Sequence, residues 1–414
     1  MKPMKLLQPN YFDAFHCIGA ACEDTCCIGW LVNVDKTTYD RYQTCSGSEL
    51  ASSLHTLITI NEKSANDDDY ARVVLNGAMC PFLSEGLCSI QRQLGEEFLP
   101  NMCATYPRIR NSAGDVLQQS LDLSCPEAAR LALLDARPIE FAEKEYTDGS
   151  IRPGNFPALD TSGMREFREI QRLVIGLLQN RSHVLWKRLL LLGWLCEELD
   201  AGSTMDAIRA HLDSFDEGAL AERPVQPAAQ VEVVLELIVA RITADTTPRR
   251  FIECYQEFMS GIQWTPQSTM DEIGDRYAEA YAQHYVSFMN RHEHMIEHYL
   301  VNYAYRTLFP FGLPESNLRL RNDRVPSSIA AQYMLLIACY AITRTLLIGM
   351  SGFHKSALSA DHVIKLVQSC TKTFEHSITY PGRVIELLAD KAMTTPSSVG
   401  VLVRPPGPLS AGLQ

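Results

Sequence analysis

Eight cysteines in the first third of the chain are the residues whose type and spacing most directly suggest chemistry. Cys17, Cys22, Cys26 and Cys27 fall in the segment HCIGAACEDTCCIGW, and four more follow in turn-like stretches: Cys80, Cys88, Cys103 and Cys125. In a turn, thiolates can point inward while backbone N–H groups stay free to donate to sulfur, as an iron–sulfur cluster requires. We therefore predict that these eight residues form a metal site holding a [4Fe-4S] cluster.

Other interpretations of these cysteines are weaker, but zinc stays open. The total of 13 cysteines is odd, and a reducing cytoplasm does not favour a disulfide framework. Structural zinc sites usually show paired C-x2-C knuckles, and no two of the eight have that spacing. A radical S-adenosylmethionine motif fails as well, because Gly29 stands where its third cysteine belongs. Cys45 stands alone in a polar run, and we expect it to be a bystander.

Composition restricts the class of protein. The 414 residues are 46% hydrophobic and 21% charged, with a formal net charge of −12, which argues against a nucleic-acid partner and suits a cationic one. The N-terminus, MKPMKLLQPNYF, lacks an apolar stretch followed by a cleavage site. We therefore expect a cytoplasmic globular protein.

The pattern of the chain changes near residue 125. Before it, short extended pieces such as GWLVNV, RVVLN and VLQQSLDLS alternate with turns. Pro126 is well placed in the first turn of a helix, and Glu127 suits the positive end of the helix dipole. We predict a mainly α protein, with an irregular cysteine-rich metal domain over residues 1–136 that contains a few short strands.

A larger all-helical domain is predicted over residues 164–393, after a connecting segment at 137–163. Several stretches carry apolar residues at i, i+3, i+4 and i+7, as in MREFREIQRLVIGLLQN. The most apolar stretch starts at Tyr333 but contains Arg344, so we expect a buried core helix and no membrane insertion. Residues 394–414 are rich in Pro, Gly and Ser and are predicted to be a disordered tail.

The cysteine-rich part and the helical part of the sequence both resemble one known family. The runs YFDAFHCIGAACEDTCCIGWLVNVDKTTYDRY, CPFL, GLCSIQRQLGEEFLPNMCATYPRI and SLDLSCPEAARLALL, together with HYLVNYAYRTLFPFG from His298 to Gly312, resemble the flagellin lysine-N-methylases of the FliB family. More loosely, the cysteine half resembles putative zinc- or iron-chelating domains with a CxxCxxCC pattern. The first resemblance implies methyl transfer from S-adenosylmethionine to lysines of flagellin. The second suggests the rival function, a non-enzymatic metal-binding or delivery protein.

Residues suited to methyl transfer lie near the resembling blocks. The chain has no Gly-rich G-x-G loop after a strand, so the methyl donor must be bound in another way. A lysine ammonium must lose its proton before it can attack, and carboxylates, tyrosines and aromatic rings can assist. The candidate catalytic residues are Tyr106, Arg108, Glu127 and Tyr303, with Tyr299 and Tyr305 in the same block as Tyr303.

Overall fold

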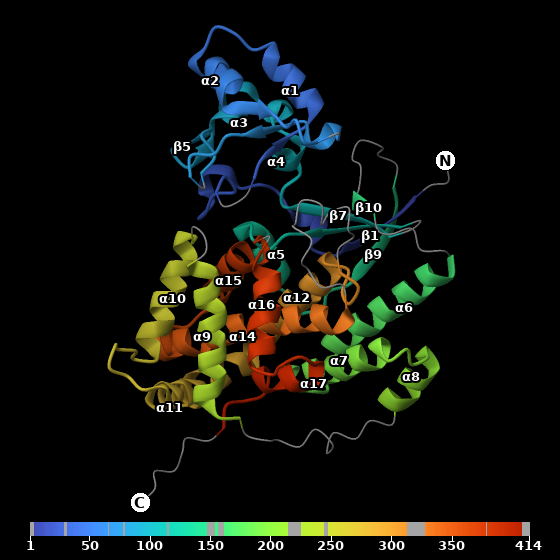
Figure 1. Ribbon diagram of the computed structural model, residues 1–414, viewed down its shortest axis with the longest axis vertical. Coiled ribbons are helices and arrows are strands. Elements are labelled where there is room, and N and C mark those ends of the chain that lie inside the picture. Colours follow the sequence, from blue (N-terminus) through green and yellow to red (C-terminus); the bar gives the residue numbers. More distant parts are fainter. Residues whose placement is uncertain are drawn as a thin grey trace, which may run out of the picture.

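The computed structural model describes residues 4–28, 31–64, 66–77, 79–113, 116–146, 154–155, 161–213, 225–243, 247–312, 328–377 and 379–407. They form a small lobe, a five-stranded sheet and a helical body (Figure 1). The larger helical part and the short N-terminal strands agree with the predicted mainly α class.

The small lobe, from Cys27 to Ala104, has its own apolar core. Its strands are β2 (Asn33–Val34), β3 (Ile58–Ile60) and β4 (Ala71–Val73), in the order β2-β4-β3, and a hairpin of β5 (Leu83–Ser84) and β6 (Leu87–Cys88). Its helices are α1 (Lys36–Gln43), α2 (Glu49–Leu57), α3 (Ser89–Leu94) and α4 (Asn101–Thr105).

Buried Asp35 holds this lobe together by capping two helices. One carboxylate oxygen accepts from the N–H of Thr38 in the first turn of α1 at 3.0 Å, and the other accepts from the N–H of Asn101 at the start of α4 at 3.0 Å. Both helices thereby have a free N-terminal donor satisfied. Asp35 thus fixes the helix that carries Cys103.

The five-stranded sheet lies between the lobe and the helical body, with the order β10-β7-β8-β1-β9 (Figure 1). β1 (Met4–Pro9) pairs in parallel with β8 (Val116–Leu121) and antiparallel with β9 (Phe141–Tyr146). β7 (Arg108–Ala113) pairs antiparallel with β8 and in parallel with β10 (Gly154–Asn155). The small lobe lies between β1 and β7 in the chain. It therefore forms most of the long connection that the parallel strands β1 and β8 need.

This sheet corrects the predicted domain limits. The connecting segment predicted at 137–163 contains β9 and β10, and the first domain is not merely irregular. Residues following β8 also share one apolar core with the helical body, whereas the small lobe has a separate core. Strand pairing between distant segments is invisible to local periodicity, which explains the error.

The helical body contains the predicted helices. They are α5 (Pro126–Leu133), α6 (Thr161–Leu178), α7 (Leu185–Asp200), α8 (Met205–Asp213), α9 (Pro227–Ile242), α10 (Arg249–Gly261), α11 (Met270–Ala280), α12 (Val286–Arg306), α14 (Ile329–His354), α15 (Ala360–Cys370), α16 (Tyr380–Asp390) and α17 (Pro396–Val399). Two π-helical turns, Tyr281–Tyr285 and Thr371–Glu375, interrupt longer helices. Pro126 occupies the first turn of α5, as predicted.

Helix α14 is the predicted core helix. Within the described ranges it is the one helix long and apolar enough to cross a membrane, but 94% of its most apolar window is buried inside the protein. The predicted disordered tail is wrong for residues 394–407, because Val399, Leu402 and Val403 are buried against the body and α17 packs on α7. Thr395 caps a short helix there together with Ser398, and Pro396 lies in its first turn; residues 408–414 lie outside the described residues.

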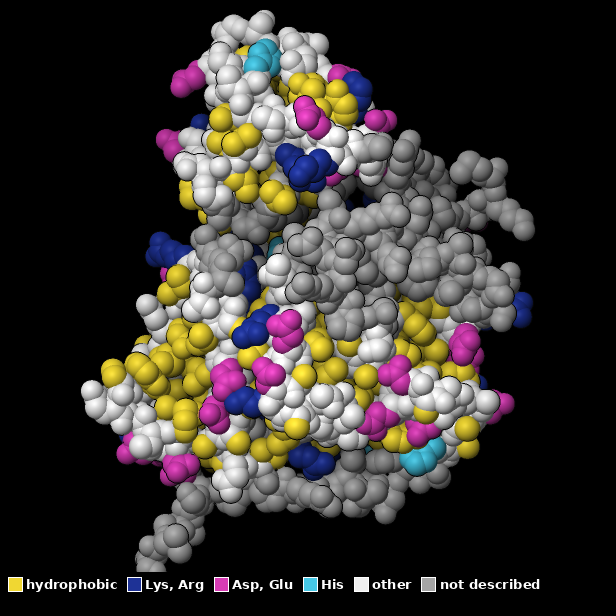
Figure 2. Space-filling view, viewed as in Figure 1, with side chains coloured by type: hydrophobic (Ala, Val, Ile, Leu, Met, Phe, Trp, Pro, Cys, Tyr) yellow, Lys and Arg dark blue, Asp and Glu magenta, His cyan; other side chains and the backbone are white. Residues whose placement is uncertain are grey.

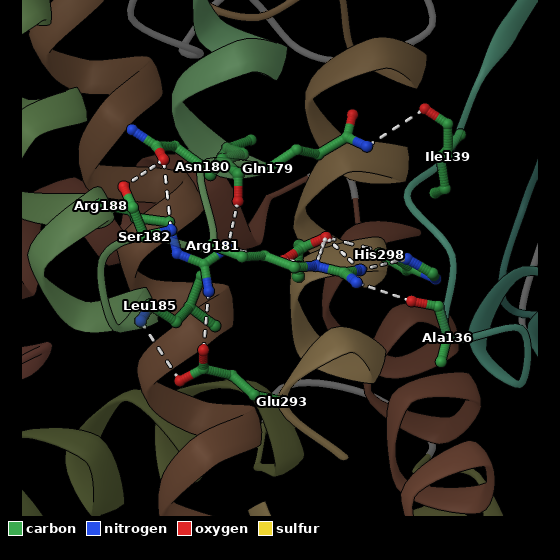
Figure 3. A network of polar contacts seen from close by, with 12 residues as sticks. Ala136, Ile139, Gln179, Asn180, Arg181, Ser182, Leu185, Arg188, Glu293 and His298 are labelled. Carbon is green, nitrogen blue, oxygen red and sulfur yellow. Dashed lines mark hydrogen bonds and ion pairs between the residues drawn. The ribbon is translucent and has the colours of Figure 1, made fainter. Parts of the chain in front are cut away.

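A buried ion network fastens α12 to α6, α7 and the chain after α5 (Figure 3). Glu297 is 1% exposed and accepts from Arg188 at 2.6 Å and from Arg181 at 2.8 Å. His298 donates from Nδ1 to the Ala132 carbonyl at 2.9 Å and accepts at Nε2 from Arg181 at 3.4 Å. This bonding requires the neutral imidazole.

We expect Glu297→Gln to lower the free energy of unfolding by about 2 kcal/mol, because the charge-assisted hydrogen bonds from two arginines are weakened. The expected loss of stability is limited, because Arg188 still forms its ion pair with Glu293 and Arg181 is partly exposed to solvent. Urea denaturation measures it. The matched control is Glu386→Gln, whose partner Arg383 lies on the surface; equal effects of the two changes would contradict the expectation.

Candidate metal centre and the polar cluster beside it

Five of the eight predicted thiols line one cavity of about 60 Å³ in the small lobe: Cys26, Cys27, Cys80, Cys88 and Cys103. We call the space that these five cysteines line the thiol cavity. The rest of its wall is mostly apolar and contains Val32, Val73, Phe82, Ile90, Leu99 and Pro100, with Gln91 and Tyr106. Four separate segments of the chain therefore place sulfur around one space, which brings together five of the eight predicted ligands.

Local backbone structure points the sulfurs inward. The Cys80 N–H donates to the Cys27 carbonyl at 2.9 Å, which joins two of the segments directly. Cys88 stands just before α3, where the backbone at Gln91 and Ile90 helps to lower the pKa of its thiol. Backbone N–H donors stabilise a thiolate and its bonds to a metal.

The thiol cavity contains thiols of contrasting acidity. Hydrogen bonds with Cys27 lower the pKa of Cys26 to about 7 and that of Cys88 to about 6. The same contacts raise the pKa of Cys27 itself, while burial raises those of Cys80 and Cys103. Two sulfurs are therefore able to ionise near neutral pH, and a metal would have to displace protons from the others.

The donor set of the cavity suits a soft metal. Among the described residues of its wall, the thiols are the side chains that soft metals prefer, and thiolates suit iron–sulfur clusters and zinc alike. Among the described residues, no three His, Cys, Asp or Glu side chains are placed so that they could hold a single metal ion. In this geometry the thiols surround a cavity without forming a ready-made mononuclear site.

The other three predicted ligands lie apart from the thiol cavity. Cys17, Cys22 and Cys125 do not line it. Burial raises the pKa of Cys125 to about 12, the backbone at Ala128 and Glu127 opposes this, and nearby Cys22 and Cys17 raise the pKa further. These three cysteines therefore form a second thiol group at the start of α5.

Tyr106 lies between the two groups of thiols. It lines the cavity, and its hydroxyl forms a 2.9 Å hydrogen bond with Ser124, the residue before Cys125. Burial raises the pKa of Tyr106 well above its usual value, and Asp122, Cys125 and Cys26 raise it further. At neutral pH the phenol keeps its proton.

A buried polar cluster continues from this point: Asp122, Tyr299, Arg306, Glu375 and His376. Asp122 Oδ2 lies 3.1 Å from His376 Nε2 and 3.7 Å from Arg306 Nη1. Arg306 also forms an ion pair with Glu375, which accepts from the Tyr299 hydroxyl at 2.8 Å. The cluster joins residues from the end of β8, from α12 and from the π-helical turn Thr371–Glu375.

Charge balance keeps Asp122 ionised in this cluster. Burial would raise the pKa of Asp122, but His376 and Arg306 outweigh burial and hold it well below its usual value. The pKa of Arg306 is likewise raised by Glu375 and Asp122, although burial opposes this. Two carboxylates, a guanidinium and an imidazole therefore meet in a desolvated site, where such groups can bind and transfer protons.

The predicted catalytic residues are placed differently from one another. Tyr106 and Tyr303 adjoin the polar cluster, the Tyr303 ring lying 6.0 Å from the Arg306 guanidinium. Arg108 instead lies over the Phe15 ring at 4.9 Å. Glu127 forms an ion pair with Arg130. None of these positions establishes a catalytic role, so the four assignments stay predictions.

Sequence analysis missed the members of the polar cluster other than Tyr299. Asp122 and Arg306 lie inside the resembling blocks SLDLSCPE and HYLVNYAYRTLFPFG. Their closeness in sequence to predicted site residues could have identified them as candidates. Glu375 and His376 follow an ordinary amphipathic helix and carry no comparable pattern.

Comparison with known proteins identifies the family of the chain. The family model described as the FliB lysine N-methylase C-terminal domain matches residues 171–402, which is more than half of the chain. The chain belongs to the FliB family. The matched region contains α12 and the π-helical turn at 371–375, and so supplies all of the polar cluster except Asp122.

Two relatives give the extent of the similarity. A lysine-N-methylase of Salmonella typhimurium is 31% identical over 147 residues, 35% of this chain and 36% of the relative. The flagellar biosynthetic protein FliU of Salmonella muenchen is 31% identical over 148 residues, 35% of this chain and 86% of the relative. The match thus spans about a third of the length of the lysine-N-methylase. No solved structure matches the chain.

Proposed function

We propose that this FliB-family protein is a protein-lysine N-methyltransferase that acts in the cytoplasm, takes methyl groups from S-adenosylmethionine and modifies flagellin. The observation that carries the proposal is the family match over residues 171–402. The name of the Salmonella muenchen relative, a flagellar biosynthetic protein, supports a substrate of the flagellum. The rival function, metal binding without catalysis, has no separate observation in its favour.

The reaction sets clear demands on the chain. The lone pair of the lysine nitrogen attacks the methyl carbon; a C–N bond forms, the C–S bond breaks, and the sulfonium sulfur keeps the electron pair. The substrate ammonium must first lose a proton, which a nearby base accepts. We assign this step to the polar cluster, where ionised Asp122 can hold the ammonium and the imidazole of His376 lies beside it.

We further propose that the thiol cavity holds a [4Fe-4S] cluster, with zinc as the alternative. The five cysteines that line the cavity and the lowered pKa of the Cys88 thiol support this. When bound, the cluster would cross-link segments of the small lobe that otherwise have little regular structure. Tyr106 would then separate the metal centre from the polar cluster.

The function is tested by incubating anaerobically purified protein with S-adenosylmethionine and flagellin. Mass spectrometry should detect increments of one methyl group on flagellin lysines, and omission of the methyl donor should abolish them. Asp122→Asn should retain metal but lose most of this activity. Bound metal without methylation of flagellin under any of these conditions would instead support the metal-binding alternative.

Salt should weaken the encounter with flagellin. The net charge of −12 favours a partner that offers lysines, and the attraction is screened over roughly 8 Å at physiological ionic strength. Acidic and basic side chains are interspersed on the face in Figure 2, so we expect a general field and not one patch. Rising ionic strength should lower kcat/KM while saturating kcat changes little. A kcat/KM independent of salt would mean that shape and apolar contacts govern recognition.

A further inference from the structure

The segment from Cys22 to Cys27 links the two groups of thiols. Cys22 belongs to the second thiol group, and Cys26 and Cys27 line the thiol cavity. Between them, the side chain of Asp24 accepts from the Thr25 N–H at 2.8 Å, and the Thr25 hydroxyl accepts from the Cys27 N–H at 3.1 Å. Contacts that fix Asp24 and Thr25 therefore also fix the backbone of Cys27.

Two side chains from the helical body hold this segment. Lys372 donates to Asp24 Oδ2 at 2.9 Å and to the Thr25 carbonyl at 2.7 Å. Gln368 donates to the same carboxylate oxygen at 2.8 Å and to the Ser124 carbonyl at 2.8 Å. These contacts join residues almost 350 positions apart and tie both thiol-bearing regions to one helix.

Lys372 is placed unusually for a lysine. Its side chain is 7% exposed, and it lies in the π-helical turn Thr371–Glu375, which also contributes Glu375 to the polar cluster. Burying an ammonium is costly unless it is paired and hydrogen-bonded, and π-helical turns often occur at functional sites.

We propose that Lys372 is a positioning residue for the thiol cavity: its buried ammonium fixes the Cys22–Cys27 segment on the helical body and places one positive charge beside the thiolates. The second part of the inference rests on the proposed metal centre, whereas the first part concerns the protein alone. Glu375 and His376 of the polar cluster belong to the same short segment as Lys372. This segment therefore contacts the thiol-bearing residues 22–27 and also contributes to the polar cluster.

The test compares Lys372→Met with Lys365→Met. Lys365 lies on α15, just before the π-helical turn that carries Lys372, and pairs with Glu253 and Glu257; it is therefore a matched control. In metal-free protein, hydrogen–deuterium exchange of residues 22–27 should be about tenfold faster in Lys372→Met, because charge-assisted hydrogen bonds are lost. Lys365→Met should leave exchange of that segment unchanged, and Lys372→Arg should largely restore it.

The charge is tested on anaerobically reconstituted protein. The midpoint potential of the bound cluster should move to a more negative value in Lys372→Met, because a positive charge that stabilises the reduced state is removed, and should stay unchanged in Lys365→Met. If Lys372→Met does not fold, Asp24→Asn removes the ionic partner and should also speed exchange at residues 22–27. Unchanged exchange in whichever of these variants folds would overturn the positioning role. If the wild type binds no iron, the metal proposal fails, while the exchange comparison still decides the positioning role.

Discussion

Cys103→Ala is expected to remove the metal and to destabilise the small lobe. The Cys103 thiol lines the thiol cavity on α4, and a metal bound there would connect four otherwise separate segments. In metal-loaded protein we expect the lobe to lose more than about 3 kcal/mol of stability, since metal binding is part of its folding free energy. In metal-free protein the same change should cost only about 1 kcal/mol, because it removes one small buried group.

Iron, acid-labile sulfide and thermal melting measure these effects. The wild type should be brown and contain both iron and sulfide, whereas stoichiometric zinc without sulfide would refute the iron–sulfur assignment. Cys45→Ala is the control, since Cys45 packs on the same core and its thiol donates to the Arg41 carbonyl at 3.8 Å without lining the cavity. Equal destabilisation by the two changes, with metal retained in both, would mean that Cys103 is a packing residue.

Arg306→Met is expected to be the most destabilising single change in the polar cluster. Arg306 is 8% exposed and is placed between the carboxylates of Glu375 and Asp122. Removing the guanidinium takes away the cation that pairs with both buried carboxylates, which should cost about 3–5 kcal/mol. Urea denaturation measures the loss.

The control for Arg306→Met is Arg383→Met, whose ion pair with Glu386 is exposed on both sides. That change should cost less than about 0.5 kcal/mol, because surface ion pairs contribute little. A loss of comparable size in both variants, or none in Arg306→Met, would mean that the buried carboxylates become protonated without penalty.

The stability of the polar cluster should also depend on pH in a defined direction. Burial alone would raise the pKa of Asp122, but His376 and Arg306 hold it well below the value of about 3.9 expected in the unfolded chain. The corresponding stability is present above that unfolded pKa and is lost as the pH falls toward the folded one. Denaturation at several acidic pH values should show this loss in the wild type and a smaller one in Asp122→Asn.

Local patterns in the sequence predicted the helices and singled out the cysteines that line the thiol cavity. The helix at Pro126 and the buried core helix around Arg344 follow from position-specific residues and from periodicity, because both report which face of a segment is apolar. The cysteines lie in turns, and five of them meet, because turn residues leave side chains and N–H groups free to converge. The family was also recognisable, since its blocks are continuous in the chain.

Only the tertiary structure decided which distant residues share a site. It divided eight thiols into the thiol cavity and a second group, and it paired strands across the connection predicted at 137–163. It also brought Asp122, Arg306 and His376 together and fixed the Cys22–Cys27 segment with Lys372. Residue spacing records local geometry and burial, whereas the partner of a buried charge is selected by how whole elements pack, because only packing excludes the water that would otherwise solvate it.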